Sequence, residues 1–396
     1  MKKDSFYLPD GMIYLDGNSL GPMPLAAAER VHRTVSEEWQ EMLITGWNKA
    51  GWYHQPRVLG DRLAPIIGAA QGSVVIGDTL SIKVYQALAA ALQMRPERNV
   101  ILSDSGNFPT DLYMAEGLIK SFDRGHKLDL QLKVVDPESV ADHLDETVAV
   151  MMLTHVDYRS GRMHNMPELT RKAHNCGVVA LWDLAHSAGA LPVQIDECHA
   201  EFAVGCTYKY LNAGPGAPAF IYVRPDIADR AEPALSGWMG HSAPFAFEQQ
   251  YQAAPAIERM RIGTPPVLQM AALEAALDVW DDVSIFDVRN KSIELSECFI
   301  AEVEKRCPQL TLFSPRDSSQ RGSQVSFTFA EGYAVVQALI AEGVIGDFRA
   351  PDVLRFGFTP LYLDIDDVIQ AAAILEKVMA ERRWDKPAFK QRAAVT

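Results

Sequence analysis

Long hydrophobic runs are missing from this chain. No stretch approaches the roughly 20 consecutive apolar residues that a transmembrane helix needs. The first residues, MKKDSFYLPDGMIYLDG, hold two lysines but no apolar segment long enough for a signal peptide. We therefore expect a protein that neither crosses a membrane nor carries a secretion signal.

Cysteine and positive charge are also scarce. The five cysteines, an odd number, are scattered at positions 176, 198, 206, 298 and 307, which does not fit a disulfide framework and favours a reducing cytoplasm. The 37 basic residues are outnumbered by 51 acidic ones, for a net charge of −14. Because an acidic surface does not attract phosphate backbones or anionic lipids, we expect neither nucleic acid nor a membrane as a partner.

What the chain does contain is the composition of an ordinary globular protein, with 48% hydrophobic and 22% charged residues in 396. From residue 74 onward, short runs rich in valine and isoleucine alternate with helical patterns: VVIGD, NVILS, LQLKVVD, VAVMMLT, VVALWD, FAVGC and PAFIYV. Such runs are typical of strands that crossover helices cover on both faces. They predict an α/β fold with a mainly parallel, doubly wound sheet.

The pattern changes after Pro265-Pro266. A long amphipathic stretch at 267–305 leads to LTLFS, QVSFTFA, a helix near 333–342, the strand VLRFGF and a terminal helix at 366–383. Strands followed directly by helices indicate a smaller α+β domain. We predict three parts: an N-terminal arm (1–50) that contributes to the small domain and the active site, a large cofactor-binding domain (51–270) and a small C-terminal domain (271–396).

The arm contains a dense turn, DGNSLGP at 16–22, before a helical pattern at 25–40. Two glycines and a proline within six residues specify a tight path. An ordinary loop is the alternative.

Polar residues follow two of the apolar runs. Asp183 and His186 come after VVALW, and Tyr208 and Lys209 come after FAVGC. In an open parallel sheet a ligand binds beyond the carboxyl ends of the strands. A carboxylate and a lysine there suit pyridoxal phosphate, because the carboxylate keeps the pyridine nitrogen protonated and the lysine forms a Schiff base. The alternative is that Asp183 caps a helix and Lys209 lies at the surface.

An anion site is predicted where VVIGD passes into a helix at Asp78-Thr79-Leu80-Ser81. Backbone N–H groups at a helix start favour a phosphate, and Ser81 adds a hydroxyl donor. An N-cap by Asp78 or Thr79 is equally good chemistry for that position.

Seven motifs occur in a specific order: LDGNSLGP at 15–22, FPTD at 108–111, WDLAHSAG at 182–189, CTYKYLNAGPG at 206–216, SGWMGH at 236–241, RIGTPP at 261–266 and LRFGFTPLY at 354–362. Together they make the chain resemble the kynureninases of bacterial type, fold-type-I pyridoxal-phosphate enzymes of the aspartate aminotransferase superfamily. The likeness runs nearly from end to end. FPTD alone is weak, but the ordered set is highly specific.

The resemblance implies hydrolysis of L-kynurenine to anthranilate and L-alanine with pyridoxal 5'-phosphate as cofactor. It implies that Lys209 binds the cofactor, that Asp183 pairs with the pyridine nitrogen, and that Tyr208 is an acid/base group. A phenol, with a reference pKa of about 10, needs nearby positive charge to act as a base near neutrality. The further cofactor contacts implied are Leu80, Ser81 and Tyr208 at the phosphate, Phe108 and His186 at the ring, and Asp111 and Thr154.

The resemblance also implies a homodimer, in which Trp238 and Thr264 reach the phosphate of the neighbouring subunit. Arg355 would bind the substrate α-carboxylate, because its planar fork suits that group; a buried structural arginine is the alternative. Ser81 stands where relatives often have threonine, which keeps the hydroxyl.

Substrate choice follows from three further positions. Ser19 is implied in the wall of the aryl pocket. Trp47 and Thr264 match the bacterial type, which prefers kynurenine to 3-hydroxykynurenine because an indole offers the extra hydroxyl no polar partner.

Two further classes of enzyme share the implied fold, the cysteine desulfurases and the aminotransferases. A desulfurase needs a nucleophilic cysteine on a mobile loop, whereas Cys206 ends a buried strand and Cys298 and Cys307 fall on a helix and at its end.

Proteins outside this fold class also remain open. A metal protein would use His-Asn-Cys at 174–176 and Cys-His at 198–199, although their spacing matches no zinc pattern, and we expect no metal. A non-catalytic scaffold would not need Lys209, Asp183, Tyr208 and Arg355 together.

Overall fold

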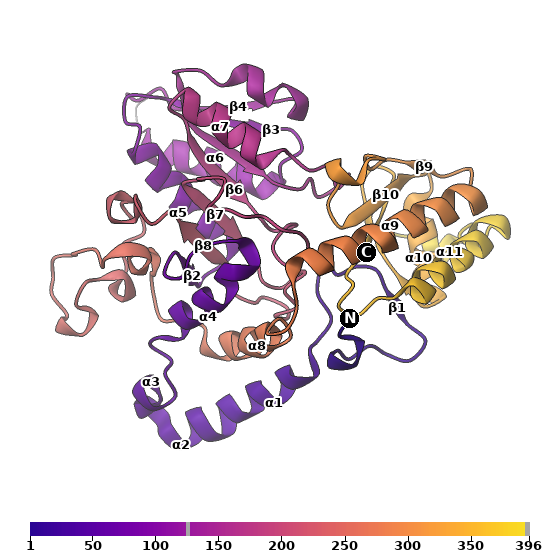
Figure 1. The fold of residues 1–396 in the computed structure, drawn as a ribbon, viewed down its shortest axis with the longest axis horizontal. Coiled ribbons are helices and arrows are strands. Elements are labelled where there is room, and N and C mark those ends of the chain that lie inside the picture. Colours follow the sequence, from indigo (N-terminus) through magenta and orange to yellow (C-terminus); the bar gives the residue numbers. More distant parts are fainter. Residues whose placement is uncertain (124–126, 393–396) are drawn as a thin grey trace.

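The computed structural model describes residues 1–123 and 127–392 (Figure 1). Its main feature is a seven-stranded sheet in the order β2-β8-β7-β6-β5-β3-β4. The strands are β2 (Val74–Ile76), β3 (Val100–Asp104), β4 (Gln131–Val135), β5 (Val148–Thr154), β6 (Val179–Asp183), β7 (Phe202–Gly205) and β8 (Phe220–Val223). Only β8 runs opposite to its neighbours among them. The predicted mainly parallel sheet is confirmed.

Helices cover both faces of this sheet, because successive side chains of a strand point to opposite faces. Along β5, Val150 and Met152 pack into one buried cluster, with α5 (Leu80–Gln93) and α6 (Pro109–Phe122). Met151 and Leu153 pack into the other cluster. That cluster includes buried residues of α4 (Gln55–Leu63), α7 (Met166–Asn175) and α8 (Val267–Asp278).

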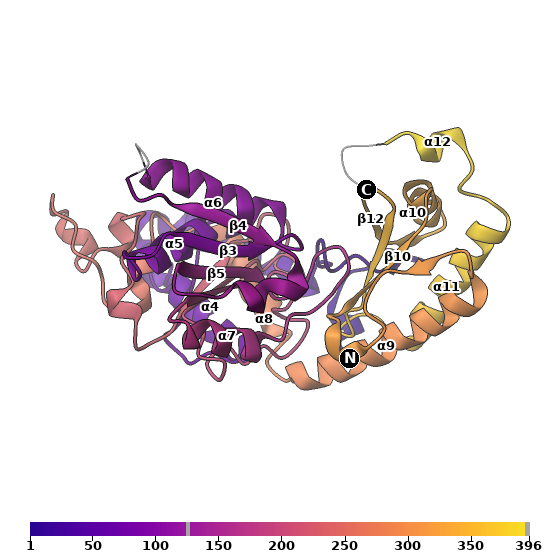
Figure 2. The same cartoon turned by 90° about the horizontal axis from the view of Figure 1, so that it is seen from above.

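A second lobe lies beside the large sheet, and α9 (Ile285–Arg306) leads into it (Figure 2). Its antiparallel sheet has the order β12-β13-β10-β9. The elements are β9 (Thr311–Leu312), β10 (Gln324–Thr328), α10 (Gly332–Ala341), β12 (Asp347–Arg349), β13 (Val353–Gly357), α11 (Ile365–Ala380) and α12 (Pro387–Lys390). This lobe is the predicted α+β unit. The amphipathic stretch at 267–305 is two helices rather than one, because Ser284 caps a new helix through the Phe286 N–H (3.2 Å).

The N-terminal arm touches both lobes. Strand β1 (Ile13–Tyr14) pairs in parallel with β11 (Val344–Ile345). The next helical elements are α1 (Leu25–Arg33), a π-helical segment (Thr34–Trp39), α2 (Gln40–Met42) and α3 (Gly46–Lys49), and α1 packs on α8. The proposed domain boundary at residue 270 lies inside α8. Short 3₁₀ turns lie at Lys3–Ser5, Leu43–Thr45, Ala64–Ile67, Pro137–His143, Ala228–Arg230, Trp238–Gly240, Pro244–Ala246, Ala256–Met260 and Ser318–Gln320.

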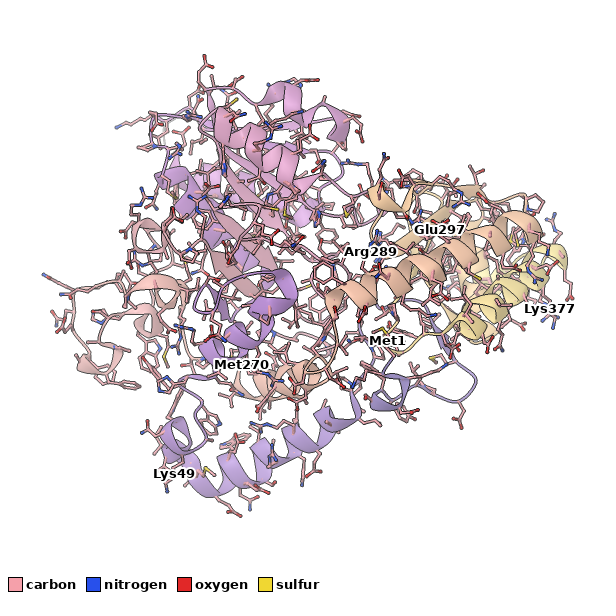
Figure 3. The ribbon with its side chains drawn as sticks, viewed as in Figure 1. Met1, Lys49, Met270, Arg289, Glu297 and Lys377 are labelled. Carbon is pink, nitrogen blue, oxygen red and sulfur yellow. The ribbon has the colours of Figure 1, made fainter. Side chains whose placement is uncertain are left out.

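The loop between β9 and β10 in the small lobe contacts both α9 and the segment that follows β5. Arg289, which lies with Glu297 along α9 (Figure 3), donates to the carbonyl oxygens of Ser318 (2.6 Å) and Arg321 (2.7 Å). The same loop accepts the Met163 N–H at the Gln320 carbonyl (2.8 Å). The small sheet is thereby fixed against the segment that follows β5. Within the described ranges, no helix has the length and apolar character to cross a bilayer.

Candidate active site

Three neighbouring parallel strands end at the same edge of the large sheet. Thr154 ends β5 opposite Asp183, which ends β6, and Asp183 is in register with Val204 of β7. Lys209 follows the end of β7 by four residues. The topology therefore brings together the carboxylate and the lysine that the sequence places at the ends of separate apolar runs.

A cavity of about 180 Å³ lies at this edge. Its lining includes nine of the fourteen predicted site residues: Ser19, Leu80, Phe108, Thr154, Asp183, His186, Tyr208, Lys209 and Arg355. Asn18, Tyr158, Ala185 and Arg349 complete it. A larger groove of about 1080 Å³ between α7 and the start of α9 is lined by none of the predicted residues, so size does not identify the site.

Lys209 faces a neutral histidine. Its Nζ lies 3.0 Å from His186 Nε2. Burial lowers the pKa of His186 well below its ordinary value, and Lys209 adds to the effect. Because the imidazole stays neutral, its Nε2 can accept a hydrogen bond from the lysine, and its ring presents an uncharged face to the cavity.

Asp183 and Asp111 form a buried pair of carboxyl groups. Both side chains are buried, at 3% and 2% exposure. Burial raises the pKa of Asp183 to about 6, against the opposing effects of Lys209 and the Ala185 N–H (2.8 Å). Burial and the neighbouring Asp183 raise the pKa of Asp111 well above its usual range. Burial and mutual repulsion thus disfavour two negative charges on this pair, and the nearby Lys209 favours the ionised form of Asp183.

The start of α5 is open to an anion. Thr79, the residue before the helix, makes no side-chain cap, and the Asp78 carboxylate instead pairs with the buried Lys83 Nζ (2.9 Å). Thr79 occupies the N-cap position, but neither its side chain nor that of Asp78 caps the helix by a hydrogen bond. The first N–H groups of α5 lack a side-chain acceptor, and Leu80 lies in the cavity wall, so a phosphate can bind there. Ser81 is the next residue but is not part of the wall.

Phe108 lies at the entrance of the cavity. It precedes α6, which begins at Pro109, and its ring is 43% exposed. The ring meets Tyr158 edge-on, with the centroids 5.2 Å apart. An exposed aromatic face at this place can stack on a planar ligand.

The turn at 16–22 brings the arm into the site. The Gly21 N–H donates to the Tyr208 carbonyl (2.8 Å), and a Cβ at Gly21 would collide with the Lys209 carbonyl. The glycine is therefore required by the close approach of two backbones. The turn is a specified part of the site rather than an ordinary loop.

Arg355 is almost fully buried, with 1% of its side chain exposed. Its guanidinium contacts both oxygens of Asp347, with Nε at 2.8 Å from Oδ1 and Nη2 against Oδ2. Nη2 also donates to Ser19 Oγ (2.7 Å) and Nη1 to the Tyr158 carbonyl. Arg355 thus has structural partners as well as a place in the cavity wall.

Tyr208, the predicted acid/base residue, carries its phenolic proton at neutral pH. The neighbouring Cys206 and burial raise the pKa of the Tyr208 phenol. The Lys209 Nζ lies 5.9 Å from the centre of its ring. Tyr208 therefore begins as a proton donor and needs added positive charge nearby to act as a base.

Five predicted residues do not line this cavity: Ser81 and Asp111, described above, and Trp47, Trp238 and Thr264. Trp47 is on α3, where its ring packs against Trp52 (6.1 Å between centroids). Trp238 is 38% exposed and stacks near Phe247. Thr264 is exposed and borders a separate small cavity beside Lys83. Their roles at the site stay predictions.

The sequence reasoning missed Asn18, Tyr158, Arg349 and Asp347. Asp347 and Arg349 belong to GDFR, just before the LRFGF motif, and their alternation with apolar residues was the available signal. The rival sites find less support. No cysteine lines the cavity, and in the described part of the chain no group of three or more histidine, cysteine or acidic side chains is arranged around a metal position.

The chain is similar to curated proteins over its whole length. It is 51% identical to a kynureninase of Burkholderia pseudomallei over 401 aligned residues, which cover 100% of this chain and 95% of the relative. It is 48% identical to a kynureninase of Pseudomonas fluorescens, with the same coverage. Residues 288–375 match the family described as the kynureninase C-terminal domain.

Solved structures agree in fold at lower identity. A cysteine desulfurase from Thermococcus onnurineus NA1 covers 96% of this chain and 97% of its own, with a TM-score of 0.79 at 18% identity. A C-DES mutant with glycine covalently linked to its PLP cofactor has a TM-score of 0.82, also at 18% identity, and covers 95% of this chain and 99% of its own. These likenesses concern the fold alone.

Proposed function

The chain belongs to the kynureninase family of fold-type-I pyridoxal-phosphate enzymes, and from this premise we propose that it hydrolyses the Cβ–Cγ bond of L-kynurenine to give anthranilate and L-alanine. The observation that carries the proposal is the convergence of Lys209, Asp183 and Arg355 on one cavity, from three elements far apart in the sequence. An amine, a buried carboxylate and a guanidinium at these places match a lysine-bound cofactor and an α-amino acid. The less favoured 3-hydroxykynurenine would enter the same site.

The residues present fit the cofactor. The uncapped start of α5 suits the phosphate, and the ionised form of Asp183 suits a protonated pyridine nitrogen. Phe108 offers an exposed ring face, and His186 a neutral one. When bound, pyridoxal phosphate supplies an electron sink for the carbanion at the substrate α-carbon.

The chain's own groups divide the proton transfers. Lys209 Nζ is the base placed to take the α-proton, because it is the amine that reaches the cavity beside His186. Tyr208, whose raised pKa keeps the phenol protonated, donates a proton to the γ-carbonyl oxygen while water adds to that carbon. The resulting phenolate takes a proton back from the hydrated carbonyl as the Cβ–Cγ bond breaks, and Tyr208 then delivers that proton to Cβ. The carboxylate of the substrate is held at Arg355.

We propose further that the enzyme is a homodimer whose sites use both subunits. Two segments project from the large lobe in Figure 1, α1 to α3 and the loop that follows β8. They carry exposed large apolar side chains: Val35, Trp39, Leu43 and Ile44 on the first, Trp238, Phe245 and Phe247 on the second. Such concentrations of exposed apolar surface indicate a covered interface. A dimer would bring Trp238 and Thr264 to the neighbouring site.

Subunit exchange tests this arrangement. Light scattering should give twice 43.8 kDa. Co-expression of Lys209→Ala with Trp238→Ala chains should restore about a quarter of the wild-type activity, because each mixed dimer has one intact site. A monomeric, active wild-type enzyme would contradict the proposal.

The activity assay is direct. Purified enzyme loaded with pyridoxal phosphate and given L-kynurenine should release anthranilate, detected by its fluorescence, and an equal amount of L-alanine. Release of sulfide from L-cysteine without anthranilate formation would instead favour a desulfurase.

A cytoplasmic location also remains a proposal. All five cysteines are free, and three of them are buried. Thiol titration of freshly isolated enzyme in denaturant should therefore find five free thiols.

A further inference from the structure

We propose that Arg349 binds the substrate α-carboxylate together with Arg355, and that Asp347 positions both guanidinium groups. The proposal rests on the proposed function, because it takes an α-amino acid as the substrate. It deepens that function by adding a second carboxylate-binding residue and a positioning residue that the family motifs did not indicate.

The strand register places the three side chains on one face. β12 and β13 are antiparallel, and Asp347 stands directly opposite Arg355. Residues two apart on a strand point to the same side, so Arg349 shares the face of Asp347. The two arginines belong to the cavity wall, and the carboxylate lies between them.

Counting donors shows that Arg355 has little capacity left. A guanidinium has five N–H groups. Asp347 takes two of them, Ser19 Oγ one and the Tyr158 carbonyl one. One N–H on Nη1 remains, so Arg355 cannot hold both oxygens of a substrate carboxylate while the Ser19 hydroxyl keeps its position.

Arg349 has the capacity that Arg355 lacks. Its Nη2 lies 2.7 Å from Asp347 Oδ2 and 3.3 Å from Ser19 Oγ, and its Nη1 donates to the Phe348 carbonyl (2.9 Å). Nε and the second N–H of Nη1 have no acceptor in the described part of the chain. Its side chain is 32% exposed, against 1% for Arg355. It can therefore turn toward an incoming anion without leaving a packed position.

The Ser19 hydroxyl marks the binding point. It donates to Asp347 Oδ2 (2.6 Å) and accepts from both arginines, at 2.7 and 3.3 Å. An oxygen atom that accepts from two guanidinium groups shows that both arginines reach the same point. A substrate carboxylate bound beside the hydroxyl, at the free N–H groups of Arg349 and the remaining N–H of Arg355, would bridge the two guanidinium groups while Ser19 keeps its hydrogen bond to Asp347.

The charge balance agrees with one bound carboxylate. Two arginines face a single buried aspartate, Asp347. Asp16, the other acidic group of the cluster, is held largely protonated below neutral pH, because burial and Asp347 raise its pKa to about 7. Below neutral pH the cluster thus carries an excess of one positive charge, which a substrate carboxylate neutralises.

Kinetics of the cofactor-loaded enzyme test the proposal. Arg349→Gln should raise KM for L-kynurenine about 10- to 100-fold, the equivalent of one charge-assisted hydrogen bond, while kcat stays within about threefold. Asp347→Asn should raise KM in the same way, and Arg349→Lys should restore part of the loss. Arg316→Gln is the matched control, because Arg316 is 53% exposed on the small lobe and pairs with Glu297.

A ligand without the carboxylate separates recognition from structural damage. The inhibition constant of kynurenamine, which is kynurenine lacking its carboxylate, should be the same for wild type and Arg349→Gln. Equal losses for both compounds, or no change in KM, would overturn the proposal.

Binding of L-alanine decides the matter independently of turnover. It can be followed by the visible absorption of the bound cofactor. Arg349→Gln should weaken L-alanine binding by the same factor as it raises KM for kynurenine. If the wild type forms no anthranilate, the proposed function fails, whereas an unchanged Kd for L-alanine in Arg349→Gln removes the role of Arg349.

Discussion

The stability of an Asp16→Asn variant relative to wild type should rise from acid to alkaline pH. Asp16 Oδ1 is buried without a hydrogen-bond partner. Burial raises the pKa of this carboxyl to about 7, repulsion from Asp347 adds to the shift, and Arg355 opposes it. Asparagine has the shape of the protonated acid and can donate to Asp347 as that acid does, but it never ionises.

The sign and size follow from proton linkage. A group whose folded pKa is raised stabilises the native state fully below its unfolded pKa and loses that contribution as the pH rises to its folded pKa. For Asp16 the interval runs from 3.8 to about 7, so the whole loss is about 4 kcal/mol at about 1.4 kcal/mol per unit. From about pH 5 to pH 8, the free energy of unfolding of Asp16→Asn should rise by about 2.5 kcal/mol relative to that of wild type.

Urea unfolding of the cofactor-loaded enzyme at these two pH values, followed by tryptophan fluorescence, measures the difference. Asp10→Asn is the control, because Asp10 is exposed on a loop of the same arm, and its free energy of unfolding should follow that of wild type at both pH values. An Asp16→Asn variant whose difference from wild type does not change with pH would refute the reasoning, because it would mean that Asp16 is ionised in the folded protein throughout the range.

Four further outcomes are expected. Lys209→Ala should lose the visible absorption of bound cofactor together with activity, whereas Lys172→Ala, at an exposed lysine, should keep both. Tyr208→Phe should lower kcat by about 10²- to 10⁴-fold with the cofactor retained, because a positioned proton donor contributes that much; full turnover would contradict the role. Asp111→Asn should keep kcat/KM within about threefold and Asp111→Ala should lose about tenfold or more, because the Asp111 carboxyl, whose pKa is raised by burial, supplies a buried partner to Asp183. Finally, kcat/KM should be higher for L-kynurenine than for 3-hydroxykynurenine, and the reverse order would count against the reading of Trp47 and Thr264.

The large sheet was predictable because its strands are buried on both faces. Runs such as VAVMMLT lack the alternation of polar and apolar residues that marks a strand with one face in solvent. All seven residues of β5 are indeed buried. The small lobe was less clear. The break between α8 and α9 was missed because the sequence stays amphipathic through it, and β12 was missed because a three-residue strand has too short a pattern to detect.

The chemistry of the site was predictable only in part. Asp183 and Lys209 stand at the ends of apolar runs, so the rule for parallel sheets was enough to select them. The protonation states were not predictable. The pKa values of Asp183 and Asp111 are both raised because the two carboxyl groups are buried close to each other, and no local pattern records that proximity.

The sequence by itself determined the large sheet, its polar strand ends and, through ordered motifs, the family. The tertiary structure decided how the groups share charge and hydrogen bonds. Ser19, Asp347 and Arg355 come from the arm, β12 and β13, and only folding places them within hydrogen-bond distance. The role of Arg349 could not be predicted from the sequence for the same physical reason. Whether an arginine has a free N–H group depends on every acceptor around it, and most of those acceptors are distant in the chain.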